Sequence, residues 1–125
     1  MPKRVLLAED EPHIIESLSF LLNRAGFDID TEMNGAKALD EALNNPPDVM
    51  LLDVMLPDID GFEMLRQLRA DPRTTGLPVV MLTAKGQRED RDRATRLGAD
   101  VFITKPFSNT EVVDTVTRLA EDGRA

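Results

Sequence analysis

Short apolar runs alternate with segments of helical periodicity from one end of the chain to the other. Four runs have no polar interruption and are typical of parallel strands covered on both faces; they occupy residues 5–8, 49–52, 79–82 and 101–103. A fifth segment, residues 27–30, alternates apolar and acidic side chains. We therefore expect this segment at an edge of the sheet, where one of its faces meets water.

Between these runs, apolar residues recur three and four positions apart, which predicts five amphipathic helices. The expected inner faces are Ile14, Ile15, Leu18, Leu21, Leu22 and Ala25; Ala36, Leu39, Ala42 and Leu43; Phe62, Leu65 and Leu68; Ala94 and Leu97, within residues 87–97; and Val112, Val113, Val116, Leu119 and Ala120. Gly26 is positioned to end the first helix. Asp60 with Glu63, and Ser108 with Glu111, have the spacing of capping boxes that start the third and fifth helices.

Strictly alternating strands and helices predict a single doubly wound α/β domain over residues 1–125, with a five-stranded parallel sheet and five helices. The strand orders that suit this count include the flavodoxin-like order 2-1-3-4-5. In such sheets ligands bind outside the carboxyl ends of the strands. The residues that follow each apolar run are therefore the place to look for chemistry.

Polar side chains follow four of the five expected strands. Glu9 and Asp10 come after the first run and Asp53 after the third, while Thr83 and Lys105 lie at the ends of the fourth and fifth. Two carboxylates 4 Å apart repel by about 4 kcal/mol at an effective dielectric near 20. Oxygen ligands without histidine or cysteine suit Mg²⁺, which would relieve this repulsion.

An aspartate beside Mg²⁺, with a lysine and a threonine facing it, is equipped for phosphoryl transfer. The carboxylate can attack phosphorus in line while the cations neutralise the equatorial oxygens. Each residue alone has an ordinary structural interpretation, as a cap, a turn or a surface lysine. Their joint placement at the ends of separate strands favours a functional site for phosphoryl transfer. We expect His13, the only histidine, to be a surface residue of the first helix.

Composition narrows the remaining functions. The chain has no cysteine, which excludes disulfides and thiolate chemistry, and its net charge of −8 argues against direct nucleic-acid binding by this domain. No apolar run approaches the ~20 residues of a membrane span, and the start does not have the pattern of a secretion signal. We therefore expect no membrane insertion and a cytoplasmic location.

Four segments together resemble the CheY-like receiver domain of two-component response regulators: residues 5–11, 52–62, 81–84 and 98–107. The resemblance covers nearly the whole chain and implies the 2-1-3-4-5 order. It also implies that Asp53 accepts a phosphoryl group from a histidine kinase or phosphotransfer protein. Asp10, Asp53 and the main-chain carbonyl of Met55 would then bind Mg²⁺, with Glu9 acting through water.

The same resemblance implies further roles. Lys105 would contact the phosphoryl oxygens, and the Lys105–Pro106 peptide bond would be cis. Thr83 and Phe102 would move on phosphorylation and switch the face made by the fourth helix, the fifth strand and the fifth helix. The domain would be a signalling switch rather than a turnover enzyme.

Some positions differ from the family's commonest pattern. Glu9 stands where Asp is more frequent, and Phe102 where Tyr is more frequent. Met55 and Lys85 lie two residues beyond Asp53 and Thr83, at places that tune phosphate lifetime in this family. Our hypothesis is that Lys85 favours the binding of acidic donors or partners.

Alternatives remain on sequence grounds. A haloacid-dehalogenase-like phosphatase would have a second aspartate where Met55 stands, and a flavodoxin-type cofactor binder would need a phosphate loop in place of the acidic residues after the first strand. A receiver-like interaction module that needs no phosphorylation would lack one of the key site residues. The downstream target or output domain is unknown. The charged fourth helix could support a homodimer or form a solvated face.

Overall fold

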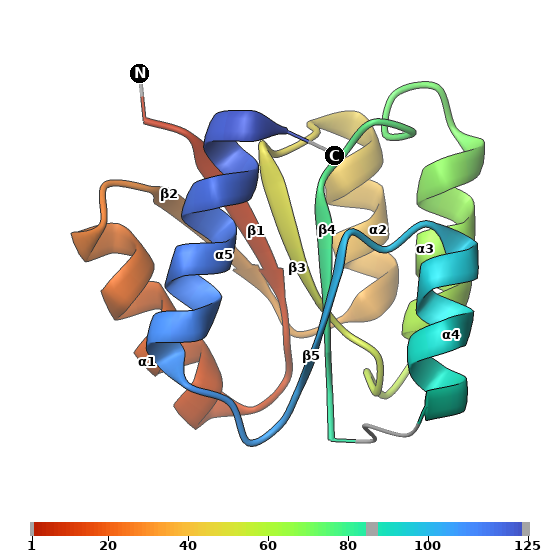
Figure 1. The fold of residues 1–125 in the computed structure, drawn as a ribbon. Coiled ribbons are helices and arrows are strands. Elements are labelled where there is room, and N and C mark those ends of the chain that lie inside the picture. The colour runs from red at the N-terminus through yellow and green to blue at the C-terminus, as the bar shows by residue number, and fades with distance from the viewer. Residues whose placement is uncertain (1, 85–87, 124–125) are drawn as a thin grey trace.

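The computed structural model describes residues 2–84 and 88–123 and contains, within these ranges, five strands that alternate with five helices (Figure 1). The strands are β1 (Arg4–Ala8), β2 (Asp28–Glu32), β3 (Val49–Asp53), β4 (Val79–Thr83) and β5 (Val101–Thr104). The helices are α1 (Pro12–Arg24), α2 (Gly35–Asn44), α3 (Gly61–Ala70), α4 (Arg88–Leu97) and α5 (Asn109–Asp122). Among these, no helix has the length and apolar character needed to cross a bilayer.

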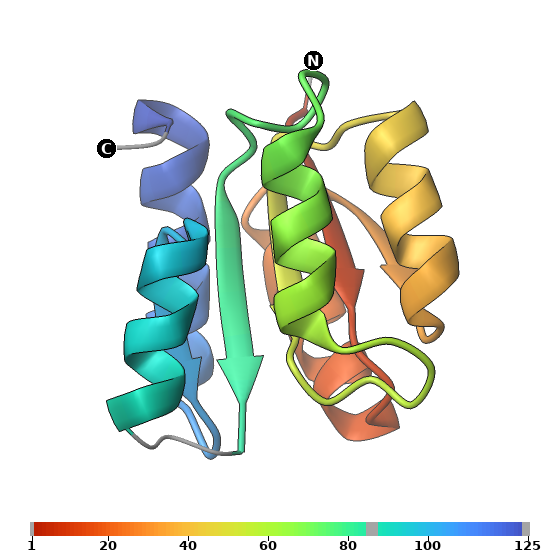
Figure 2. The same cartoon turned by 90° about the vertical axis from the view of Figure 1, so that its right-hand side faces the viewer.

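The strands form one parallel sheet in the order β2-β1-β3-β4-β5, which confirms the expected doubly wound, flavodoxin-like fold. β2 lies at an edge, as its alternating pattern predicted. Helices α1 and α5 cover one face of the sheet, and α2, α3 and α4 cover the other (Figures 1 and 2). All strands point the same way, so their carboxyl ends meet at one edge of the sheet.

Two apolar cores lie on the two faces of the sheet. In β1, Leu6 packs toward α2 and α3 while Val5 and Leu7 pack toward α1 and α5. In β3, Met50 and Leu51 divide between the same two cores. Every apolar position of these two strands is therefore covered, which explains their uninterrupted apolar runs. Each leucine buried in this way contributes about 1.5–3 kcal/mol.

The expected helix faces hold for α5 and need correction in α1 and α2. In α2 the buried residues are Gly35, Ala38, Leu39 and Ala42, whereas Ala36 is exposed. Ala36 lies in the first turn, beside residues of the loop that follows β3. Ala38, and not Ala36, packs against the sheet. Ala25 is also exposed, because it caps α1 after the last helical residue and is followed by Gly26 at φ +101°.

Within the described residues, side-chain caps start three helices, α2, α3 and α5. Ser108 accepts a hydrogen bond from the Glu111 N–H at 3.4 Å, which agrees with the predicted cap of α5. Asp60 instead accepts from Phe62, at 2.9 Å, so the expected bond to the Glu63 N–H is replaced by one a residue earlier. Asn34 caps α2 through the Lys37 N–H.

Two expectations from the sequence cannot be compared with the structure. Lys85, and with it the hypothesis about acidic donors, lies outside the described residues. Gln87, the expected start of the fourth helix, also lies outside them, and the described helix begins at Arg88.

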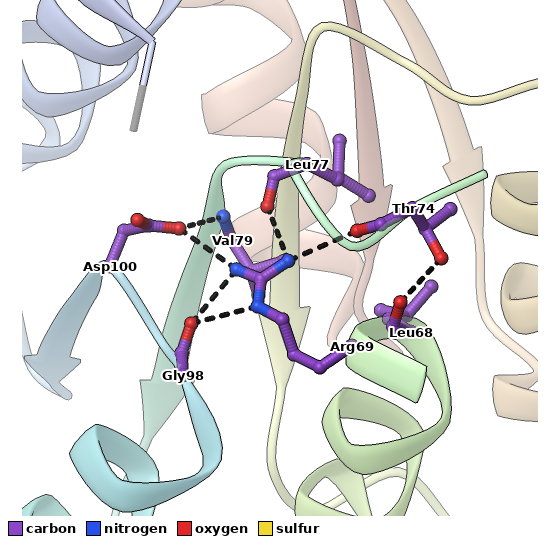
Figure 3. A network of polar contacts seen from close by, with 7 residues as sticks. All are labelled: Leu68, Arg69, Thr74, Leu77, Val79, Gly98 and Asp100. Carbon is purple, nitrogen blue, oxygen red and sulfur yellow. Dashed lines mark hydrogen bonds and ion pairs between the residues drawn. The ribbon is translucent and has the colours of Figure 1, made fainter. Parts of the chain in front are cut away.

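Arg69, near the end of α3, joins several elements at the amino-terminal ends of the strands, opposite their carboxyl ends (Figure 3). Its guanidinium donates to the carbonyls of Gly98, Leu77 and Thr74 and lies 3.0 Å from the Asp100 carboxylate. Asp100 also accepts from the Val79 N–H at 2.8 Å. Arg69 and Asp100 are 13% and 8% exposed, so this ion pair is largely shielded from water. The network fixes the starts of β4 and β5 against α3 and α4.

Replacing Arg69 by Met is expected to lower the free energy of unfolding by about 3–5 kcal/mol, because it leaves a largely buried carboxylate without its cation. Urea denaturation followed by circular dichroism measures the change. The matched control is Arg66→Met, which removes an exposed arginine that pairs with Glu63 on the same helix. Exposed pairs contribute little, so the control should unfold close to the parent. Equal stability of the two variants would contradict a structural role for Arg69.

Candidate functional site

The carboxyl edge of the sheet gathers the polar residues that follow the strands. Glu9 and Asp10 come directly after β1, Asp53 is the last residue of β3 and Thr83 the last residue of β4. Lys105 follows β5, and its N–H donates to the Thr83 carbonyl at 2.7 Å. The parallel register therefore brings residues distant in sequence to neighbouring positions.

Three carboxylates form a tight cluster at this edge. Glu9, Asp10 and Asp53 each offer one oxygen, and these oxygens lie within 4.8 Å of one another. Glu9 is fully buried and Asp53 is 3% exposed. One Glu9 oxygen, Oε2, accepts from the N–H groups of Asp10 and Glu11 at 3.1 and 3.2 Å. The longer glutamate arm is thus bonded to the loop that follows its own strand.

The Lys105 ammonium faces this cluster. Its Nζ lies 2.8 Å from Glu9 Oε1 and 3.1 Å from Asp53 Oδ2, with Glu11 farther away at 3.6 Å. The Lys105–Pro106 peptide bond is cis, as the resemblance implied. The other Asp53 oxygen, Oδ1, accepts from the Met55 N–H at 2.9 Å. Asp53 is therefore held between an ammonium group and a backbone donor.

The cluster contains three carboxylates and one ammonium group, and their proximity and burial shift the pKa values of Glu9 and Lys105. Burial, together with a hydrogen bond and charge from Asp53, raises the pKa of Glu9 to about 7, although Lys105 acts in the opposite direction. Burial by itself would lower the pKa of Lys105, but the hydrogen bonds and charges of Glu9 and Asp53 outweigh it and raise the pKa. Burial and the neighbouring Asp53 carboxylate therefore disfavour the charged form of Glu9, and Lys105 offsets this only in part.

A divalent cation would supply the charge that the cluster needs. The donor set consists of oxygens from Glu9, Asp10 and Asp53, which is the chemistry that Mg²⁺ prefers. The residues therefore fit a magnesium ion.

The loop between β3 and α3 passes over this edge. At its base, the Gly61 N–H donates to the Val54 carbonyl at 3.0 Å. A Cβ at Gly61 would lie 2.7 Å from the Val54 Cα, so this close approach requires glycine. Met55, early in the loop, is 52% exposed.

The expected switch residues lie on adjacent strands. Thr83 is buried, and it lines a hollow of about 560 Å³ together with the β3–α3 loop and with Asp90 and Arg93 of α4. Phe102 is partly buried against the core on the α4 side of the sheet. The Arg91 guanidinium lies over its ring, 5.3 Å from the centroid. His13 is exposed on α1, as expected.

Two contacts near the site were missed by the sequence analysis. Arg91 of α4 stacks on Phe102 and donates to Thr104 at 3.0 Å. Asp58 of the β3–α3 loop accepts from the first N–H groups of α2, which are 22 and 23 residues away. No short-range spacing marks either contact, because each depends on how the elements pack.

Comparison with known proteins identifies the family to which this chain is similar. The sequence model described as the response regulator receiver domain matches residues 5–117. The alkaline phosphatase synthesis transcriptional regulatory protein PhoP of Bacillus subtilis is 43% identical over 112 residues, which are 90% of this chain and 46% of PhoP. The phosphate regulon transcriptional regulatory protein PhoB of Escherichia coli is 44% identical over 120 residues, covering 90% of this chain and 49% of PhoB.

A solved structure is similar over nearly the whole fold. The chemotaxis response regulator CheY4 of Vibrio cholerae has a TM-score of 0.88 and 28% identity, over 95% of this chain and 99% of CheY4. The chain spans about half the length of the curated relatives PhoP and PhoB. These matches set aside the phosphatase and flavodoxin-type alternatives. The chain belongs to the family of response regulator receiver domains of two-component systems.

Proposed function

We propose that Asp53 is the phosphoacceptor of a signalling switch and that its donor is the phosphohistidine of a histidine kinase or phosphotransfer protein. The observation that carries this proposal is the setting of the Asp53 carboxylate. One of its oxygens is held by the Met55 N–H and the other lies 3.1 Å from the Lys105 ammonium, beside Glu9 and Asp10. An attacking carboxylate needs such fixed orientation and nearby positive charge.

In the proposed step, an oxygen of Asp53 forms a bond to phosphorus as the bond between phosphorus and the donor imidazole breaks. The electron pair of the broken bond returns to the imidazole ring. Asp10, Asp53 and the main-chain carbonyl of Met55 would hold Mg²⁺, with Glu9 bound through water. When bound, Mg²⁺ would neutralise charge on the phosphoryl oxygens. Lys105 would contact these oxygens once the phosphoryl group is attached, and the 3.1 Å between its ammonium and the Asp53 carboxylate supports this role.

The switch would act through Thr83 and Phe102. The added charge of the phosphoryl group favours a state in which the Thr83 hydroxyl hydrogen-bonds to it. Phe102 would then rotate toward the space that Thr83 leaves. Because Arg91 lies over the Phe102 ring, this rotation would alter a contact between β5 and α4. The face formed by α4, β5 and α5 is therefore the proposed output surface.

The wider role is proposed from the relatives. PhoP and PhoB are named as transcriptional regulatory proteins, and this chain matches about half of each. We infer that it serves as the receiver part of a regulator and passes its signal to an output domain or a downstream partner, with homodimerisation through α4, β5 and α5 as one route. Its net charge of −8 supports a domain that does not itself bind nucleic acid. We place this signalling in the cytoplasm and regard the domain as a switch rather than a turnover enzyme.

Incubation with acetyl phosphate and Mg²⁺ is expected to add one phosphoryl group, a mass increase of about 80 Da. Intact-mass spectrometry should show this species in the parent chain and in Asp114→Asn, a control at an exposed position of α5. Asp53→Asn should not acquire it, because the amide is not a nucleophile toward phosphorus. A parent chain that stays unmodified, or an adduct that survives Asp53→Asn, would favour the module that needs no phosphorylation.

Mg²⁺ is expected to stabilise the folded chain by about 2.7 kcal/mol at a concentration one hundred times its Kd. Urea denaturation with Mg²⁺, compared with EDTA at matched ionic strength, measures this gain. In Asp10→Asn the gain should shrink at the same Mg²⁺ concentration, while the metal-free stability should rise because one of three crowded charges is removed. A gain equal to that of the parent would argue that Asp10 is not a ligand.

A further inference from the structure

Asp58 connects the β3–α3 loop to the start of α2. Its Oδ1 accepts from the Gly35 N–H at 2.7 Å and its Oδ2 accepts from the Ala36 N–H at 2.9 Å. These are the first two residues of α2, whose N–H groups have no acceptor within the helix. The hydrogen bonds from Ala36 and Gly35 lower the pKa of Asp58. Both carboxylate oxygens are thus used to attach the loop to the helix.

Apolar packing reinforces this attachment. Ile59, the next residue of the loop, packs against the core that lies under α2 and α3. A Cβ at Gly35 would collide with the Ile59 Cγ2, so the absence of a side chain at Gly35 allows the loop to approach the helix. The loop is therefore docked on α2 by a carboxylate and by an apolar side chain, side by side.

The same loop carries Met55, whose carbonyl is a proposed metal ligand. On one side, the Met55 N–H donates to Asp53 and the base of the loop is closed by the bond between Gly61 and Val54. On the other side, the attachment through Asp58 comes only three residues later. The Met55 peptide thus lies between two fixed points. Releasing the Asp58 attachment would leave the packing of Ile59 and the bond between Gly61 and Val54 as the next fixed points after Met55.

The start of α2 is also tied to the other side of the carboxylate cluster. The Glu9 N–H donates to the Glu32 carbonyl at 3.1 Å, and the Glu32 side chain accepts from the Asn34 N–H at 3.2 Å. The corner between β2 and α2 is therefore bonded both to the chain at Glu9 and to the loop at Asp58. It forms a bridge between the two segments that supply the proposed ligands.

We propose that Asp58 is a positioning residue of the magnesium site, which it shapes by anchoring the β3–α3 loop to the first turn of α2. The inference rests on the proposed function, in which the Met55 carbonyl binds Mg²⁺. Asp58 would act through the loop backbone and would not itself bind the metal. A ligand held on both sides loses less freedom when the ion binds, which raises affinity.

The test is Mg²⁺ affinity, measured by isothermal titration calorimetry on folded parent and variant chains. Asp58→Ala removes both acceptors and is expected to weaken Mg²⁺ binding about tenfold, the lower range for loss of a residue that orients metal ligands. Asp58→Asn removes the same charge but keeps one oxygen that can accept from α2. It should retain most of the affinity, which separates anchoring from simple charge attraction.

Asn34→Ala is the matched control. Asn34 caps the same helix by accepting from the Lys37 N–H at 2.9 Å, and among the described residues its side chain makes no hydrogen bond to the β3–α3 loop. It should lower the stability of α2 and leave Mg²⁺ affinity unchanged. In the metal-free chain, amide hydrogen exchange should become faster at Met55 in Asp58→Ala and not in Asn34→Ala. This second readout does not depend on metal binding.

The outcomes separate the inference from the function on which it rests. A parent chain that binds no Mg²⁺ would overturn the proposed magnesium site and the inference with it. A parent that binds Mg²⁺ and an Asp58→Ala variant of equal affinity would overturn the inference alone. Equal losses in Asp58→Ala and Asp58→Asn would assign the effect to charge, and equal losses in Asp58→Ala and Asn34→Ala would assign it to helix stability; either result would also overturn it.

Discussion

Repulsion among three carboxylates is the constraint around which the functional edge of this domain is built. Glu9, Asp10 and Asp53 lie within 4.8 Å of one another, and the Lys105 ammonium contacts two of them. Burial of Glu9, together with the hydrogen bond and charge of Asp53, raises the pKa of Glu9 although Lys105 opposes the change. A cluster of this kind is unfavourable for folding and useful for binding, because it gains stability from any divalent cation or additional positive charge.

The opposite edge of the sheet has the reverse character. There the Arg69 guanidinium is matched by the Asp100 carboxylate and by backbone carbonyls, so its charge and donors are satisfied within the protein. This edge holds the starts of β4 and β5 in place. The strands β4 and β5 are thus fixed at their starts and lead at their other ends to Thr83 and Lys105 of the proposed site.

The β3–α3 loop and α4 each make a contact close to the carboxylate cluster. Asp58 joins the loop to α2, and Arg91 joins α4 to the ring of Phe102. The first contact links α2 to the loop that follows Asp53, and the second links α4 to β5. In the proposed function the two contacts have different roles. Asp58 would hold the metal-binding loop in position, and the contact of Arg91 with Phe102 would change when Phe102 rotates.

Much of this arrangement could be predicted from the chain alone. Uninterrupted apolar runs such as 49–52 mark strands covered on both faces, and the acidic alternation at 27–30 marks an edge strand. Once parallel strands are inferred, their carboxyl ends must meet. The convergence of Glu9, Asp10, Asp53 and Lys105 then follows from sequence order and topology, without any knowledge of side-chain contacts.

Other features depended on packing and could not be derived in this way. Ala36 is exposed and Ala38 is buried because of where α2 begins, and hydrogen bonds to Asn34 and to Asp58 hold that start. The partners of Arg69 lie up to 31 residues away. Local periodicity reports which residues face the core, because it is set by the geometry of one element. Which polar groups form hydrogen bonds and ion pairs with one another is decided only when separate elements pack together, that is, by the tertiary structure.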